Sequence, residues 1–282
     1  MPGYVAIAEV PRSQPAPPTF DVLGVRVDAV QIPEMIRRLE QWIGEVPRGR
    51  YVTLTNVHAI MEAQSRPVFK QVLNRAASVC PDGMPLVWLG RRAGHSLPRR
   101  VYGPDLLWDF CRATERQGYS HFFYGGGPGT AQRLAAELTT RFPGVRVAGC
   151  YSPPFRPLSA AEDEAIVRRI NDAAPDLLWV GLGCPKQEFW MHQHAGLLRV
   201  PVMLGVGQAF DLYAGNLRQA PRWMREHGLE WLFRLCREPR RLGKRYLVYN
   251  SWFVTALCWQ VLMSAAKNSP AVAFLSDSER GQ

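Results

Sequence analysis

Short apolar runs of strand length alternate with helical segments along most of this chain, and this alternation limits the folds open to it. The runs expected to form strands are 20–27, 51–54, 77–80, 121–126, 145–150, 176–181 and 200–205. Because these runs are apolar throughout, they are typical of a parallel sheet that helices cover on both faces. The sequence therefore predicts an α/β fold, a Rossmann-like parallel sheet with flanking helices.

Helical periodicity fills the segments between the predicted strands. The expected helices are 33–43, 58–74 with a break at Pro67, 84–90, 104–117, 128–142 and 186–194. Ser159 and Glu162 have the three-residue spacing of a capping box, which predicts that a further helix begins there.

Size and composition indicate one main domain with additions at both ends. A chain of 282 residues that is 47% hydrophobic can bury a full core. Residues 1–18 hold five prolines and no signal-peptide apolar region, so we expect a disordered lead. The core is expected over 19–217, a C-terminal helical, membrane-associating appendage over 218–268, and a flexible tail over 269–282. The six cysteines form no CxxC pair, which favours reduced thiols in the cytoplasm.

The expected appendage is both basic and aromatic. Residues 218–245 hold nine Lys or Arg against three Asp or Glu, a net charge of +6 out of +10 for the whole chain. The 21 residues 246–266 that follow carry no charge, but polar residues dilute them and Tyr and Trp are spread through them. This pattern favours a helix that lies on an anionic membrane surface. A spanning helix and an ordinary docking or dimer contact are the alternatives, and a homo-oligomer stays open.

Polar or glycine-rich clusters follow five of the predicted strands. They are Thr55-Asn56, Asp82-Gly83, Gly125 to Gly129, Gly181 to Gln187, and Gly205 to Asp211. In parallel sheets of this type, ligands bind beyond the carboxyl ends of the strands. We therefore expect the five clusters to form one site.

The run Gly125-Gly126-Gly127-Pro128-Gly129 predicts a turn between a strand and a helix. Such a turn offers backbone N–H groups and the positive helix end to a phosphate, although a turn without a ligand is the alternative. Thr130 stands where a dinucleotide fingerprint needs its third glycine, and no acidic residue ends the next strand. The pattern thus disfavours NAD and leaves a nucleotide diphosphate open.

Individual side chains in these clusters suggest chemistry. Asp82 fits either a helix cap or a general base that takes a proton from a hydroxyl nucleophile. Lys186 and Gln187 begin a helix within reach of a phosphate or a sugar, whereas Cys184 is interpreted as a small buried thiol. The chain has no DxD pair, so we expect no metal and look to cationic side chains to balance a diphosphate. The candidates are Arg100, Arg218, Arg234, Arg241 and Lys244.

Seven blocks of sequence, in this order, together resemble the WecG/TagA/CpsF family, glycosyltransferase family 26. They read NVHAIMEA, PDGMPLVW, RVYGPDLLWDF, FFYGGGPG, PDLLWVGLGCPKQEFW, GVGQAFDLYAG and GLEWLFRLCREPRRLGKRYL. The resemblance covers roughly residues 20 to 255 and departs from some members at Leu54-Thr55-Asn56 and at Arg218-Gln219.

The resemblance implies an inverting glycosyltransferase that needs neither metal nor cofactor. Its partners would be a UDP-sugar donor, a polyprenyl-diphosphate-linked acceptor and the inner membrane, where the protein would be peripheral on the cytoplasmic face. The implied catalytic residue is Asp82. The implied substrate-binding residues are Thr55, Asn56, Gly83, Arg100, Gly125, Gly126, Gly127, Gly129, Lys186, Gln187, Phe210, Asp211, Arg234, Arg241 and Lys244.

Two other classes of protein compete with this interpretation. The net charge of +10 suits a nucleic-acid-binding protein, but the charge gathers in one aromatic-rich tail and no nucleic-acid motif occurs, so we expect no nucleic-acid partner. A membrane scaffold without catalytic activity is the second alternative.

Overall fold

The computed structural model describes residues 16–46 and 48–267, except for the side chains of 222, 226, 241, 244–246 and 261–267. Most of the expected disordered lead and all of the expected flexible tail lie outside these residues. The chain divides into two compact units between Leu229 and Glu230. Each unit is described by itself.

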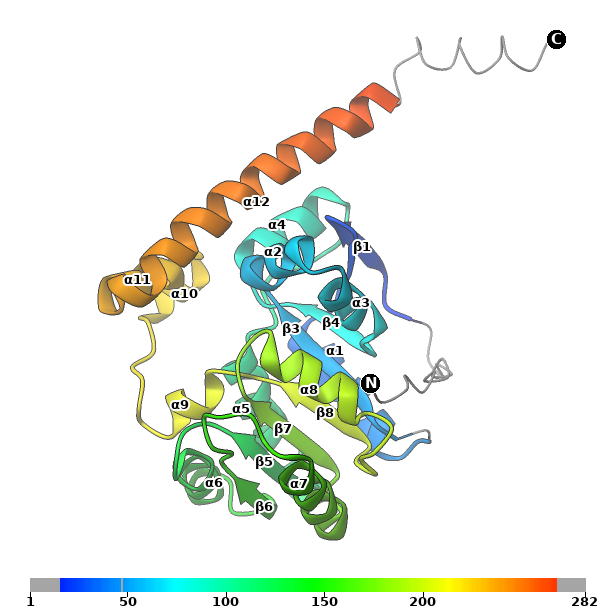
Figure 1. Ribbon diagram of the computed structural model, residues 1–282, viewed down its shortest axis with the longest axis vertical. Helices are drawn as coiled ribbons and strands as arrows, with labels where there is room; N and C mark the ends of the chain where they lie inside the picture. The colour runs from blue at the N-terminus through cyan, green and yellow to red at the C-terminus, as the bar shows by residue number, and fades with distance from the viewer. Residues whose placement is uncertain (1–15, 47, 268–282) are drawn as a thin grey trace, which may run out of the picture. The chain divides into compact units, whose positions relative to one another are not determined.

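Six parallel strands form the central sheet of the first unit (Figure 1). The strands are β3 (Arg50–Thr55), β4 (Ser78–Pro81), β5 (Ser120–Gly125), β6 (Arg146–Tyr151), β7 (Leu177–Gly181) and β8 (Val202–Gly205). Their order is β4-β3-β8-β7-β5-β6, and each neighbouring pair is parallel. The predicted α/β fold is confirmed, and all six carboxyl ends lie at one edge.

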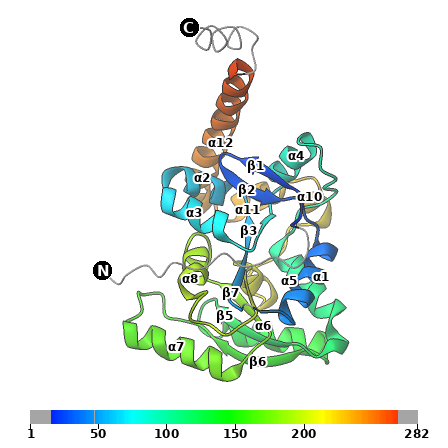
Figure 2. The same ribbon diagram turned by 90° about the vertical axis from the view of Figure 1, so that its right-hand side faces the viewer.

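The first predicted strand is wrong in detail, because residues 20–27 do not form a single strand. They form an antiparallel hairpin of β1 (Thr19–Val22) and β2 (Val25–Asp28), which contacts β4, α3 (Pro67–Arg75) and α4 (Met84–Arg92) (Figure 2). Leu23 and Gly24 turn the chain with φ of 54° and 81°. Apolar residues continue through the turn, so a hydrophobic pattern alone hides it.

Helices cover both faces of the sheet, as the apolar strands require (Figure 1). One face carries α1 (Ile32–Ile43), α5 (Gly103–Ala113), α6 (Thr130–Arg141) and α9 (Ala209–Tyr213). The other face carries α2 (Val57–Ser65), α3, α7 (Ala160–Ala173) and α8 (Lys186–His194). The 3-10 helix η1 (Glu115–Gln117) and α10 (Arg222–Glu226) complete the unit.

Local signals in the sequence correctly marked several helix ends. Pro67 separates α2 from α3, because proline fits the first turn of a helix but not its interior. Ser159 Oγ accepts from the Glu162 N–H, and Glu162 Oε2 accepts from the Ser159 N–H at 2.8 Å, so the predicted capping box is formed.

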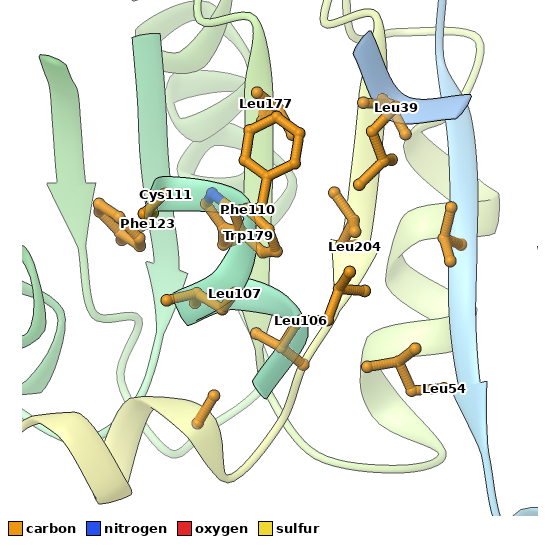
Figure 3. Close-up of a cluster of buried hydrophobic side chains, with 14 of the residues drawn as sticks. Leu39, Leu54, Leu106, Leu107, Phe110, Cys111, Phe123, Leu177, Trp179 and Leu204 are labelled. Carbon is orange, nitrogen blue, oxygen red and sulfur yellow. The ribbon is translucent and has the colours of Figure 1, made fainter. Parts of the chain in front are cut away.

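A dense apolar layer lies between the sheet and helices α1, α5 and α6 (Figure 3). Phe110 of α5 packs edge-on against Trp179 of β7, and both side chains are fully buried. Burial of each such side chain contributes roughly 1.5–3 kcal/mol to folding. This layer holds the strands in register beneath the carboxyl edge.

The described part of the second unit, residues 230–267, consists of two helices, α11 (Glu230–Arg237) and α12 (Pro239–Lys267). Among the side chains described on them, seven large apolar ones are exposed, namely Trp231, Leu232, Leu247, Val248, Trp252, Val254 and Trp259. Among the helices in the described ranges, none has the length and hydropathy needed to cross a bilayer.

Candidate functional site

Asp82 and Asn56 lie side by side at the carboxyl edge because β3 and β4 are paired. The Asp82 N–H donates to the Thr55 carbonyl at 2.9 Å. A Cβ on Gly83 would lie 3.5 Å from Asn56 Cβ, so the two strand ends nearly touch. Asn56 Oδ1 accepts from the Ala59 N–H at 3.3 Å and caps α2. The half-buried Asp82 thus occupies a fixed position beside a fixed amide.

The segment before α5 brings a cation and an aromatic ring to the same place. Val101 donates its N–H to the Pro81 carbonyl at 2.8 Å, which ties this segment to the end of β4. The Arg100 guanidinium lies 4.1 Å from the centre of the Tyr102 ring. Tyr102 Oη accepts from Gln208 Nε2 at 2.8 Å, which links the β4 end to the loop after β8.

The first turn of α5 begins directly against the strand ends. A Cβ on Gly103 would lie 3.0 Å from Leu54 Cδ1 and 3.1 Å from the Val206 carbonyl oxygen. Glycine therefore permits a contact that a larger residue would push apart. The positive end of this 11-residue helix lies next to Arg100, so the edge near Asp82 favours an anion.

Gln187 is held from both ends of its amide at the start of α8. Its Oε1 accepts from the Gly183 N–H at 3.2 Å, and its Nε2 donates to Glu188 Oε1 at 3.0 Å. A Cβ on Gly205 would lie 2.9 Å from that Nε2. The amide therefore fills the space between the ends of β7 and β8, with only 4% of the residue exposed.

Glu188 is a buried acid behind that amide, with 1% of its surface exposed. Burial away from water disfavours the carboxylate and raises the pKa of Glu188 to about 7, although hydrogen bonds from Gln187, its own backbone and Cys184 oppose this. Glu188 can therefore change its protonation state close to neutral pH.

The glycine-rich turn after β5 is shaped by close backbone approach. A Cβ on Gly125, whose φ is 138°, would lie 2.5 Å from the carbonyl of Gly181. Gly126 donates its N–H to the Gly181 carbonyl at 3.0 Å, so this donor is already used within the fold. Gly129 caps α6 with a φ of 73°.

The remaining predicted residues differ in how they meet this edge. Thr55 is buried, with its hydroxyl 3.3 Å from that of Thr53. Phe210 is fully buried beneath Gly181 and packs against Phe123. Both side chains are covered, so they pack beneath the edge and are not open to a ligand there.

The other predicted residues lie nearer to the surface. Lys186 is exposed at the start of α8, and the Gly127 carbonyl accepts from the Thr130 N–H. Asp211 Oδ1 accepts from Asn216 Nδ2 at 2.9 Å and lies near the start of α6.

The cluster around Asp82 and the glycine turn lie far apart along the edge. Four strand spacings separate β4 from β5. At the usual distance between strands, this is about 19 Å. Three strands lie between them, β3, β8 and β7, and Gln208 and Gln187 follow β8 and β7. The site is therefore an elongated edge with a carboxylate at one end and glycines at the other.

The cations predicted on the appendage belong to the second unit. Arg234 lies on α11, half-buried. Arg241 and Lys244 are on α12, and their side chains lie outside the described residues. Arg218 stays in the first unit, exposed after α9.

Sequence reasoning did not single out three residues that the structure adds to this edge, Tyr102, Gln208 and Glu188. All three lie inside sequence blocks that carried the resemblance, which was the available signal. Tyr102 and Gln208 contact each other from segments far apart in the chain, so no local spacing reveals them. The reported partners of Glu188 are its neighbours, and its role is revealed only by its burial. Within the described residues, no three His, Cys, Asp or Glu side chains form a group that would hold a metal.

A parallel sheet with a carboxylate, amides and glycine turns along its carboxyl edge defines a Rossmann-like α/β enzyme. Comparison with known protein families identifies the family to which this enzyme belongs. The chain belongs to the glycosyl transferase WecG/TagA/CpsF family, which it matches over residues 20–267, and it is a glycosyltransferase.

Curated relatives carry a more detailed name. A protein of Bacillus spizizenii is 28% identical over 75% of this chain and 80% of its own length. One of Staphylococcus aureus is 25% identical over 79% of this chain and 87% of its own length. Both are named N-acetylglucosaminyldiphosphoundecaprenol N-acetyl-beta-D-mannosaminyltransferase.

Proposed function

We propose that this protein moves a sugar from a UDP-sugar to a polyprenyl-diphosphate-linked saccharide for a cell-envelope polymer, with inversion and without a metal. The position of Asp82 carries the proposal: a carboxylate fixed at the carboxyl edge beside Asn56, at the strand end to which Val101, next to Arg100, is hydrogen-bonded. The relatives' names supply the class of acceptor, a diphosphoundecaprenol-linked sugar, and an amino sugar as the group transferred.

The chemistry is a direct displacement at the anomeric carbon. Asp82 accepts the proton of an acceptor hydroxyl as the hydroxyl oxygen attacks C1 of the donor sugar. The bond from C1 to the β-phosphate oxygen breaks on the opposite face, and UDP leaves with the electron pair. The charge that develops on UDP is balanced by Arg100 and the positive end of α5, aided by the cations of the second unit.

Asp82→Asn tests the role of the carboxylate. The amide keeps the shape but cannot take a proton, so turnover should fall roughly 10²–10⁴-fold. The assay uses UDP-sugars and a short-chain polyprenyl-diphosphate saccharide in EDTA, and follows the mass of the product. UDP affinity, measured separately, should stay near the wild-type value. Wild-type turnover in the variant would contradict the role of Asp82, and a strict metal requirement would contradict the metal-free mechanism.

The second unit supports a place at the cytoplasmic face of the inner membrane. Its exposed Trp, Leu and Val side chains suit the headgroup layer, and its arginines suit anionic lipids. Such a surface would bring the enzyme to an acceptor that is itself anchored by a polyprenyl chain.

A further inference from the structure

Phe155, which the mechanism above does not use, stands next to the glycine turn. It lies in the loop between β6 and α7, and 86% of its surface is exposed. A Cβ on Gly127 would lie 3.7 Å from Phe155 Cζ and 3.8 Å from Cε2. Single exposed apolar residues are common on proteins, so exposure alone does not indicate a site. At Phe155, however, the exposed ring lies beside the candidate site on an anchored loop.

The loop that carries Phe155 is anchored at both ends. Before Phe155, Ser152 Oγ donates to the Gly125 carbonyl at 3.0 Å, which fastens the loop to the glycine turn. After it, Arg156 forms two hydrogen bonds with Glu162, of 2.8 and 2.6 Å, and Glu162 also closes the capping box of α7. The phenyl ring is therefore held on a fixed loop. A flat ligand that stacks on this ring would lose little binding free energy to the ordering of the loop.

The length of the edge decides which part of a donor reaches this ring. In the proposed reaction the anomeric carbon must lie near Asp82, about 19 Å from the glycine turn at the usual strand spacing. A diphosphate seated on residues 125–129 would hold the anomeric carbon too far from Asp82. The diphosphate must therefore lie over β8 and β7, nearer to Gln187 and Gln208, and the nucleoside must extend toward β5 and β6. The Gly126 N–H, already donated to Gly181, agrees with this assignment.

We propose that Phe155 is the stacking platform for the pyrimidine base of the donor, with the glycine turn beneath the ribose. This inference rests on the proposed function, because it uses the place of the anomeric carbon at Asp82. Gly127 lacks a side chain beside the ring, so the base can approach both the backbone and the phenyl face. Every nucleobase can stack on an aromatic ring. We therefore expect Phe155 to increase the affinity for the nucleotide and to contribute little to the selection of uracil over other bases.

The test measures UDP binding by isothermal titration calorimetry. It compares the full-length wild-type protein with its Phe155→Ala and Phe155→Tyr variants. Loss of one base–aromatic stack should raise the UDP Kd roughly 5- to 100-fold in Phe155→Ala. Phe155→Tyr keeps the ring and should stay close to wild type. Leu197→Ala is the matched control, because Leu197 is exposed at the opposite edge of the sheet, in the loop before β8.

Steady-state kinetics give the second measurement. The donor KM should rise in Phe155→Ala while the acceptor KM stays unchanged. An unchanged UDP Kd in Phe155→Ala would overturn the inference and leave the proposed function standing. A change in acceptor KM alone would also overturn it, since the ring would then contact the acceptor. Failure of the wild-type protein to bind UDP would instead overturn the proposed donor.

Discussion

At the scale of single residues, this edge combines groups that are shielded from water with groups that meet it. Asp82 is half-buried and fixed by its neighbours, whereas Glu188 is wholly buried behind Gln187. The burial of Glu188 has an energetic cost because its carboxylate loses contact with water. Its effect on stability is therefore measurable apart from catalysis.

Glu188 should make the folded protein less stable as the pH rises. Its folded pKa, about 7, lies above the usual value of 4.5, so between these values the folded state holds a proton that the unfolded state has released. Stability is then lost from about pH 4.5 to pH 7, at up to roughly 1.4 kcal/mol per pH unit. Glu188→Gln removes this dependence.

Thermal or urea unfolding at pH 5 and pH 8 measures the effect. The gain in stability of Glu188→Gln over wild type should be larger at pH 8. An equal gain at both pH values would show that Glu188 does not titrate in this range. Glu164→Gln is a matched control, because the Glu164 side chain is 70% exposed.

At the scale of elements, close contacts between strand ends determine where the loops can go. Gly125, Gly181 and Phe210 stack on one another at the ends of β5 and β7. A Cβ on Gly181 would collide with the Phe210 ring, which is fully buried and has no free space to enter. This packing by itself explains why Gly125 and Gly181 are glycines, without any contact to a bound phosphate.

Gly181→Ala should therefore destabilise the first unit. Overpacking of this kind costs roughly 1–3 kcal/mol. Gly196→Ala is the control, since no atom lies within 4 Å of a Cβ at that position. Its stability should stay within about 0.5 kcal/mol of wild type. Urea unfolding followed by circular dichroism compares the two variants, and equal losses would contradict the packing argument.

At the scale of the whole molecule, the chain has one unit with the candidate site and a second unit that is helical, basic and aromatic. The buried layer of the sheet lies wholly within the first unit, so a protein that ends at Leu229 should fold. If the second unit supplies the cations for UDP departure, this truncated protein should lose transfer activity by at least roughly 100-fold. It should also lose binding to vesicles that contain phosphatidylglycerol.

Arg234→Ala in the full-length protein separates the two roles of the second unit. One cation fewer should slow transfer, whereas binding to anionic vesicles should persist because the other arginines and the exposed Trp side chains remain. Full activity of the truncated protein on a soluble short-chain acceptor would mean that the second unit is only an anchor. Cooperative unfolding of the truncated protein confirms that a loss of activity is not a loss of fold.

The sequence by itself determined the class of fold and the edge of the sheet at which the candidate site residues lie. Strand length, apolar runs and the capping box at Ser159 are local patterns, and local patterns predict local elements. Because parallel strands share one carboxyl edge, the residues after each strand were expected at that edge, where they lie. The hairpin at Leu23-Gly24 was missed because an apolar run continued through it.

Only the tertiary structure decided the order of the strands along that edge. The order β4-β3-β8-β7-β5-β6 arises from long-range packing, so no spacing in the chain reports it. It brings Asp82 against Asn56, joins Tyr102 to Gln208, and separates Asp82 from the glycine turn by about 19 Å. From the sequence, the glycine turn was predicted to bind a phosphate. The distance between Asp82 and the glycine turn instead favours the nucleoside of the donor at this turn. That distance depends on the order in which the strands pack in the sheet, and the hydrophobic periodicity of the chain does not report this order.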